Sequence, residues 1–253
     1  MDVQFLILAA GKGKRMNNAD LPKVLVELHG RPLIRHLLDS VHNVPSPYTP
    51  VIVVGHKAEL VRAALGNTYL YATQQELLGT GHAVMSAKGV VTAPYVMVVN
   101  GDTPFVPAEF LTKLAEAMTE ESVMAMGTIA LEDYSDWRST YVSHGRIIRD
   151  ATGRVLAVRE YKDASEEERA IHEVNLGFYI FKTDWMYEQL GNVDNHNAQG
   201  EYYLTDLVAL ALASGHEVPT VAIGPVEGLG INSVEHLEQA TVLVQPKYQL
   251  VLE

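Results

Sequence analysis

The chain has 253 residues, of which 47% are hydrophobic and 20% charged, a composition that suits a globular protein with one large domain or two small ones. Its net charge of -12 excludes a protein-wide basic surface for nucleic acid, so an anionic ligand would need a local cluster of positive charge. The absence of cysteine excludes disulfides, a thiolate nucleophile and cysteine-ligated zinc.

The apolar stretch at the start of the chain does not read as a secretory signal. Asp2 precedes it and the positive charges follow it, which is the reverse of the order in a signal peptide. No apolar run reaches the length that crosses a bilayer. We therefore expect a cytoplasmic protein with no membrane partner and no nucleic-acid partner.

Strand and helix patterns alternate in the first half of the chain. Short apolar runs that end in glycine or polar residues predict buried strands at Val3–Leu8, Val51–Val54 and Tyr95–Val99. Helical spacing predicts helices at Pro32–Val41, Ala58–Leu65, Gly81–Lys88 and about Ala108–Met118. This alternation predicts an α/β fold, with a parallel sheet between helices and ligands bound at the carboxyl ends of the strands.

The second half is less regular. Strands are predicted at Ser122–Leu131, Gly153–Tyr161 and Val174–Phe181, and helices at Asp163–Arg169, Thr183–Leu190, Tyr203–Ala213 and Val234 to about Tyr248. No internal repeat, low-complexity tract or linker is found. We therefore expect one domain, residues 1–253, with a cleft between two lobes.

The segment LAAGKGKRM follows the first predicted strand and is a candidate phosphate-binding loop. Glycines there let backbone N–H groups approach phosphate oxygens. Residues 12–23 also supply a local cluster of positive charge against the single acid Asp20, namely Lys12, Lys14, Arg15 and Lys23. The alternative is a plain turn with a solvated basic face, which this loop alone does not exclude.

Two other glycine-loop chemistries fit less well. A dinucleotide fingerprint needs a third glycine where Met16 stands and an acid where Gly55-His56 stands. A Walker loop would close on Gly-Lys-Ser/Thr, which Met16-Asn17-Asn18 does not provide.

The segment Asn100-Gly101-Asp102 follows another predicted strand. A carboxylate at that strand end, facing the same cleft as the glycine loop, can hold Mg²⁺ against phosphates. The alternative is an ordinary turn or helix-capping aspartate.

Gln74 and Gly79-Thr80-Gly81 form a third candidate group. A glutamine carboxamide can pair with a nucleobase edge, and the glycines let a flat base or sugar lie against the backbone. The alternative is a helix N-terminus capped by Thr80. The chain has no HExxH and no GxSxG motif, so a hydrolytic zinc site or a serine triad is not expected, and His82 reads as a structural residue.

Taken together, these motifs resemble a known family. LAAGKGKRM, LPKVL, LGTGHAV and NGDTP, followed by EYKDAS, EVNLGFYIF, NAQGEYYLTD and GIN, occur in the order seen in the sugar nucleotidyltransferases. Together these motifs resemble the pyrophosphorylase domain of the bacterial bifunctional N-acetylglucosamine-1-phosphate uridylyltransferase/glucosamine-1-phosphate acetyltransferases. The resemblance implies a Rossmann-like nucleotidyltransferase fold with a mixed, mainly parallel sheet.

The resemblance also implies a reaction, in which UTP and N-acetylglucosamine-1-phosphate give UDP-N-acetylglucosamine and pyrophosphate with Mg²⁺ as cofactor. The nucleotide part would be about residues 1–120 and the sugar part about 121–232. By this resemblance Arg15 and Lys23 would be catalytic, and Asp102 and Asn232 would bind the metal. The substrate-binding residues would be Leu8, Ala9, Ala10, Gly11, Lys23, Gln74, Gly79, Thr80, Asn100, Gly101, Asp102, Gly145, Glu160, Asn175 and Asn232.

This sequence departs from the family pattern at a few positions. Asn100 stands where the family usually has tyrosine, residues 141–145 replace a shorter Gly-Tyr-Gly, and Lys14 replaces threonine. A sister specificity for another sugar-1-phosphate or nucleotide is therefore an alternative, and a non-catalytic nucleotide-sugar sensor is another. Nothing here resembles the family's acetyltransferase β-helix, on which its trimer largely depends, so we expect a monomer or weak homo-oligomer.

Overall fold

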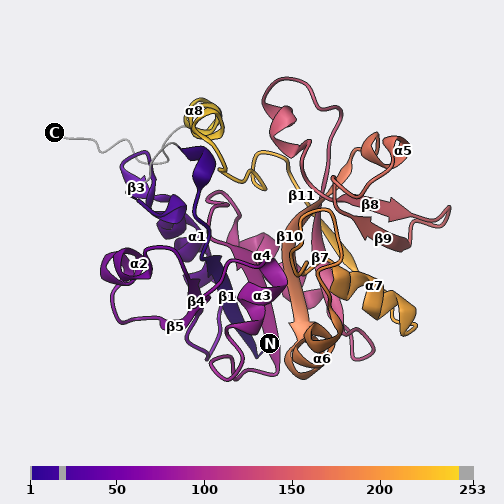
Figure 1. Cartoon of the computed structure of the whole chain (residues 1–253), viewed down its shortest axis with the longest axis horizontal. Helices are drawn as coiled ribbons and strands as arrows, with labels where there is room; N and C mark the ends of the chain where they lie inside the picture. Colours follow the sequence, from indigo (N-terminus) through magenta and orange to yellow (C-terminus); the bar gives the residue numbers. More distant parts are fainter. Residues whose placement is uncertain (1, 17–20, 245–253) are drawn as a thin grey trace.

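The computed structural model describes residues 2–16 and 21–244 and shows a mixed nine-stranded sheet (Figure 1). Its main path runs β11-β7-β10-β6-β1-β4-β5, and β8 and β9 form a hairpin that joins it through β10. The strands are β1 (Val3–Ala9), β4 (Val51–Val54), β5 (Leu70–Thr73), β6 (Tyr95–Asn100), β7 (Met124–Ala130), β8 (Arg146–Arg149), β9 (Val155–Arg159), β10 (Glu173–Lys182) and β11 (Thr220–Ile223). A separate small sheet pairs β2 (Glu27–Leu28) with β3 (Arg31–Pro32).

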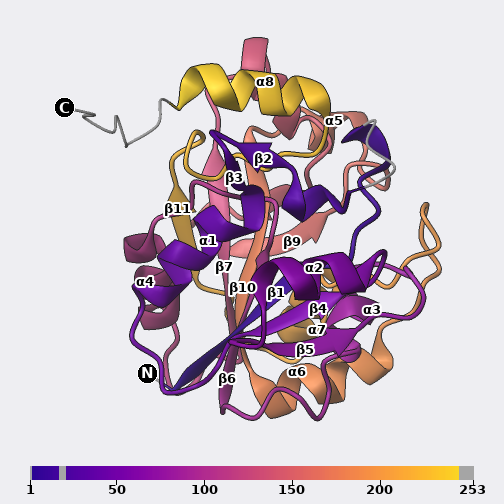
Figure 2. The same cartoon turned by 90° about the vertical axis from the view of Figure 1, so that its left-hand side faces the viewer.

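Helices cover both faces of the main sheet (Figure 1 and Figure 2). One hydrophobic cluster takes in α1 (Leu33–His42), α2 (Ala58–Leu65), α4 (Ala108–Glu116) and α8 (Val234–Leu243). The other takes in α3 (Thr80–Met85), α6 (Thr183–Gln189) and α7 (Asp206–Ala213). The remaining helical segments are α5 (Glu166–Arg169) and the 3₁₀ turns η1 (Lys14–Met16), η2 (Lys23–Leu25), η3 (Asp136–Tyr141) and η4 (Leu190–Asn192).

The central strand β1 shows why the sheet has two cores. Its side chains alternate between faces, so that Phe5 and Ile7 lie in one cluster and Leu6 in the other, all at most 1% exposed. Strand β6 pairs in parallel with β1 and places Asn100 opposite Leu8. The prediction that the loops after these two strands lie at neighbouring strand ends is therefore confirmed.

The mixed, mainly parallel sheet predicted from the family resemblance is confirmed. Strands β1, β4, β5 and β6 are parallel, whereas β10 runs antiparallel to both β6 and β7. Sequence patterns missed β5, β8 and β11, each only four residues long. Within the described ranges, no helix is long and apolar enough to cross a membrane.

Several predicted bounds were wrong. The predicted helix from Tyr203 begins only at Asp206, because the preceding residues form a loop that bonds to the start of α3. The strand predicted from Gly153 begins at Val155, after a tight turn at Gly153 with φ +90°. The last helix ends at Leu243, and the rest of its predicted range beyond 244 lies outside the described residues, as do Asn17, Asn18 and Asp20.

Candidate functional site

A cavity of about 480 Å³ opens at the carboxyl ends of β1 and β6. The loop after β1 forms one side of it, and the residues after β6 form another. Its walls comprise Leu8, Ala9, Ala10, Gly11, Lys12, Gly13, Lys23, Val24, Gln74, Leu77, Gly79, Thr80, Ala83, Asn100, Asp102 and Glu201. The glycine loop and the Asn100-Gly101-Asp102 segment thus face one space, as the alternation of strands and helices predicted.

The first loop is shaped by a glycine that has no room for a side chain. Gly13 has φ +60°, and a Cβ there would lie 2.7 Å from Cβ of Lys23. The loop can therefore close onto the segment that carries Lys23. Arg15, by contrast, lies exposed on η1 and does not line the cavity.

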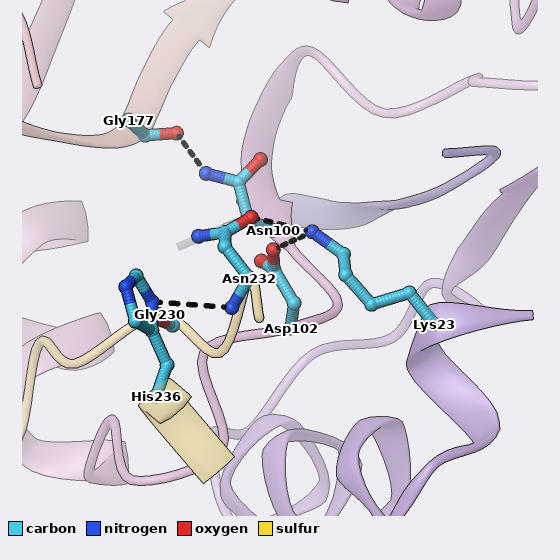
Figure 3. A network of polar contacts seen from close by, with 7 residues as sticks. All are labelled: Lys23, Asn100, Asp102, Gly177, Gly230, Asn232 and His236. Atoms are coloured by element: carbon cyan, nitrogen blue, oxygen red, sulfur yellow. Dashed lines mark hydrogen bonds and ion pairs between the residues drawn. The ribbon is translucent and has the colours of Figure 1, made fainter. Parts of the chain in front are cut away.

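Lys23, Asp102 and Asn232 meet at the edge of the cavity (Figure 3). The ammonium of Lys23 bonds to a carboxylate oxygen of Asp102 and, at 2.8 Å, to the amide oxygen of Asn232. The Lys23 and Asp102 side chains are only 16% and 14% exposed. Two oxygens from distant parts of the chain therefore converge on one positive charge.

This oxygen pair suits a hard divalent cation. Mg²⁺ binds through one or two carboxylate-type ligands and completes its octahedron with water and substrate phosphates. Among the described residues there is no group of three or more His, Cys, Asp or Glu side chains that could hold a metal by themselves. Asp102 and Asn232 could therefore supply two ligands of Mg²⁺, with water or substrate phosphates in the remaining positions.

His236, the third residue of α8, contacts the backbone of Asn232. Its Nδ1 lies 3.4 Å from the backbone nitrogen of Asn232 and 3.3 Å from the carbonyl oxygen of Gly230. Burial, together with the positive charges of Arg15 and Lys23, lowers the pKa of the His236 imidazole. The positive charge of Lys23 therefore disfavours the protonated form of this imidazole.

Another wall of the cavity forms where the backbone of residues 79–81 packs against that of residues 202–204. A Cβ on Gly79, which has φ +105°, would lie 2.6 Å from the carbonyl oxygen of Tyr202. The backbone nitrogen of Gly81 donates to that same oxygen at 2.8 Å, and Thr80 Oγ1 accepts from the nitrogen of Leu204 at 3.2 Å. This contact brings Glu201 into the cavity wall.

Gln74 sits at the base of this wall and is 4% exposed. Its Nε2 donates to the carbonyl oxygen of Gly79 at 3.0 Å and lies 3.2 Å from Nδ1 of His82. The carboxamide is therefore held in one orientation at the edge of the cavity.

A second group, next to the cavity but not lining it, joins Gly145, Glu160 and Asn175. The backbone nitrogen of Asn175 donates to the carbonyl of Gly145 at 2.9 Å. Glu160 accepts from Thr205 Oγ1 at 3.0 Å, and burial raises the pKa of its carboxyl group. These residues therefore form a polar layer beside the cavity.

This layer reaches the cavity through Asn100. The side chain of Asn175 accepts from the nitrogen of Gly177 at 2.9 Å, and the carbonyl of Gly177 accepts from Asn100 Nδ2 at 3.3 Å. Gly177 has φ +79°, and a Cβ there would lie 2.8 Å from Asn100 Nδ2. The hydrogen bond to Gly177 and the close approach of its Cα therefore fix the Nδ2 group of Asn100 in place.

The structure brings most of the predicted site residues to one place. Ten of them line the cavity, namely Leu8, Ala9, Ala10, Gly11, Lys23, Gln74, Gly79, Thr80, Asn100 and Asp102. Asn232 joins through Lys23, and Gly101 lies under the loop, where its nitrogen donates to the carbonyl of Leu8 at 3.0 Å.

Sequence reasoning gave no role to Glu201 or His236. Glu201 lies in the NAQGEYYLTD string, and this placement was a signal that could have identified it. No sequence signal pointed to His236, although its partners Gly230 and Asn232 lie only six and four positions before it.

The fold and this cavity define a nucleotidyltransferase-type protein. The solved structure of a UDP-glucose pyrophosphorylase complexed with UDP-glucose matches with a TM-score of 0.72 at 17% identity, covering 96% of this chain and 98% of that one. An inositol-1-phosphate CTP transferase from T. maritima matches with a TM-score of 0.70 at 18% identity, covering 94% and 95%. At these identities the likeness establishes the fold.

Residues 5–161 match the model of the MobA-like NTP transferase domain, and the chain belongs to this family of nucleotidyltransferases. It is 41% identical over 245 residues to the bifunctional protein GlmU of Streptococcus equi subsp. zooepidemicus, and 42% identical over 245 residues to that of Heliobacterium modesticaldum. Each match covers 96% of this chain and 52% of the relative, so the chain spans about half the length of these proteins. The resemblance drawn from the motifs is therefore confirmed.

Proposed function

We propose that the protein is a sugar-1-phosphate uridylyltransferase that converts UTP and N-acetylglucosamine-1-phosphate into UDP-N-acetylglucosamine and pyrophosphate. The observation that carries the proposal is the convergence of Lys23, Asp102 and Asn232 beside a cavity walled by a glycine-rich loop. The identity of about 40% to bifunctional GlmU proteins favours this substrate pair over others.

In this proposal the two parts of the cavity have different roles. The part built by residues 1–120 binds the nucleotide, with Leu8 to Gly11 along the phosphates and Gln74 and Gly79 at the uracil. The part built by residues 121–232 holds the sugar, with Thr80 on the shared wall and Gly145, Glu160 and Asn175 in the polar layer.

The chemistry needs position and charge rather than a covalent intermediate. A phosphate oxygen of the sugar phosphate attacks the α-phosphorus in line, the new P–O bond forms, and the bond to the bridging oxygen breaks as pyrophosphate leaves. Lys23 offsets the negative charge that develops on the phosphates, and Arg15 adds to this from the exposed loop. Asp102 and Asn232 would hold Mg²⁺, which supplies further charge neutralisation when bound.

The test is a matrix of four nucleoside triphosphates against several sugar-1-phosphates, with pyrophosphate release as the readout. We expect the highest kcat/KM for UTP with N-acetylglucosamine-1-phosphate. Asp102→Asn should lower kcat by about 10²-fold or more, because it removes the only charged oxygen of the proposed metal pair. The control Asp39→Asn alters an exposed ion pair with Arg31 and should leave kcat unchanged.

One observation favours a second candidate, a sister specificity. The Asn100 carboxamide, clamped by Gly177, faces the cavity beside the proposed sugar layer. A polar side chain there could select another sugar-1-phosphate. Greater activity with another pair would establish this candidate, and UTP binding without turnover on any pair would show a non-catalytic sensor.

A further inference from the structure

Arg146, the first residue of β8, is a buried cation with an unusual set of partners. Its side chain is 1% exposed, and it is among the largest fully buried side chains of the described chain. Its guanidinium lies 4.7 Å from the ring centre of Tyr134 and 5.2 Å from that of Tyr161. Within the part of the chain that the structure describes, no carboxylate pairs with it, so the aromatic faces offset its charge.

The hydrogen bonds of Arg146 all go to backbone carbonyls. Nε donates to Arg169 at the end of α5 at 3.1 Å, Nη2 donates to Val142 at 3.0 Å, and Nη1 donates to His144. Two of the three carbonyls belong to the loop that leads into Gly145. The planar fork of the guanidinium therefore fixes the path of this loop in a way that a single ammonium would not.

The fixed loop leads directly to the proposed sugar layer. The carbonyl of Gly145 accepts from the backbone of Asn175 at 2.9 Å. A Cβ built on Gly145 would lie 3.6 Å from a carboxylate oxygen of Glu160, so the two residues are neighbours. Tyr161, which stacks on Arg146, follows Glu160 in the chain, and a shift of the guanidinium would therefore move both sides of this layer.

Burying an arginine without a carboxylate partner costs stability, because the charge leaves water. Burial accordingly lowers the pKa of the Arg146 guanidinium. A neighbour on the same strand shows the ordinary arrangement. Arg149 donates two hydrogen bonds to the carboxylate of Glu173, at 2.7 and 2.6 Å, and a third to Thr220 Oγ1. The contrast indicates a role for Arg146 beyond holding β8 in place.

We propose that Arg146 is a positioning residue for the sugar phosphate, acting through the loop of residues 142–145 on Gly145, Glu160 and Asn175. This inference rests on the proposed function and adds a residue that does not itself touch substrate. The effect should differ between the two substrates. The nucleotide wall of the cavity lies on β1, η2 and the start of α3, and among the described residues no hydrogen bond joins this wall to the loop.

The test compares Arg146→Lys with the matched control Arg149→Lys. We expect Arg146→Lys to raise KM for the sugar phosphate by about tenfold or more while the Kd for UTP, measured by calorimetry, stays within about twofold. Arg149→Lys should lower the melting temperature, because it loses the two hydrogen bonds from the guanidinium to Glu173. It should leave the KM for the sugar phosphate and the Kd for UTP unchanged. Equal changes for both substrates in Arg146→Lys, or an unchanged KM for the sugar phosphate, would overturn the proposal.

Hydrogen exchange gives a reading that needs no turnover. The amides of His144 and Asn175, which bond to Tyr141 and Gly145, should exchange faster in Arg146→Lys and not in Arg149→Lys. If the wild type shows no turnover with any pair, the proposed function fails and this comparison alone decides whether Arg146 positions the loop. Tyr161→Leu, which removes one aromatic face and leaves the three carbonyl bonds, should shift the sugar-phosphate KM in the same direction by less, and gives a second reading if Arg146→Lys does not fold.

Discussion

Replacing Lys23 with methionine should tighten metal binding to the free protein even as it abolishes efficient turnover. In the structure the Lys23 ammonium bonds to both oxygens that we propose as metal ligands. Any divalent cation that enters this site without nucleotide must displace it. Methionine keeps the length and apolar volume of the lysine stem and removes the competing charge.

The size of the effect follows from the burial of the pair. Both side chains are less than a fifth exposed, so the ion pair is largely withdrawn from water. Close charge pairs across protein–protein interfaces show coupling energies from about 1.5 kcal/mol upward, and we take the lower figure for this pair. If the Lys23 ammonium is held by about 1.5 kcal/mol, its removal should lower the Kd for the metal about tenfold, since 1.4 kcal/mol corresponds to a factor of ten.

The assay is a titration with Mn²⁺, followed by electron paramagnetic resonance, in the absence of nucleotide. The control is Lys12→Met, which removes the same charge from a residue that lines the same cavity. We expect an unchanged Mn²⁺ affinity in the control and a turnover about 10²-fold lower or worse in Lys23→Met. An Mn²⁺ affinity in Lys23→Met that equals or falls below the wild-type value would refute the reasoning.

Two further predictions concern stability. Gly79→Ala should lower the free energy of unfolding by about 2–3 kcal/mol in a denaturant titration, because its Cβ would meet the Tyr202 carbonyl at a positive φ, whereas Gly89→Ala, with φ +86° and open space, should cost only about 1 kcal/mol. Burial, with a smaller effect from Asp194 and Asp163, raises the pKa of Asp206 to about 6. The folded state therefore binds the proton more tightly than the unfolded state. The resulting contribution to the free energy of unfolding is fully present below about pH 4 and is lost as the pH rises through 6. Asp206→Asn should therefore stabilise the protein at pH 8, by about 1 kcal/mol after allowance for solvent screening, and the gain should vanish near pH 4; a gain that is the same at both values would contradict this.

The sequence predicted the first half of the fold well because its signals are local. Buried parallel strands such as β1 and β4 are continuous apolar runs, and each is followed by a helix with clear spacing. The pairing of Leu8 with Asn100 then follows from the rule that parallel strands end at one edge. The alternation of strands and helices thus sufficed to place the glycine loop beside Asp102.

The remaining parts depend on contacts that no local pattern records. Strand β8 is four residues long and half of its residues are not fully buried, so it shows little alternation. The antiparallel direction of β10 is set by its neighbours rather than by its own composition. The grouping of Asn232 with Lys23 came only from a family resemblance, and nothing in the sequence indicated that Arg146 would be buried.

The 209 positions that separate Lys23 from Asn232 affect how the site forms during synthesis on the ribosome. A chain emerging from the ribosome can pair β1, β4, β5 and β6 before Asn232 has been made, since domains fold from the N-terminal side during synthesis. The Lys23 ammonium would then have Asp102 as a partner but not Asn232. Nascent chains would therefore complete this polar triad only after Asn232 has left the ribosome, and chains stalled before and after that point should differ in the order of the Lys23–Asp102 pair.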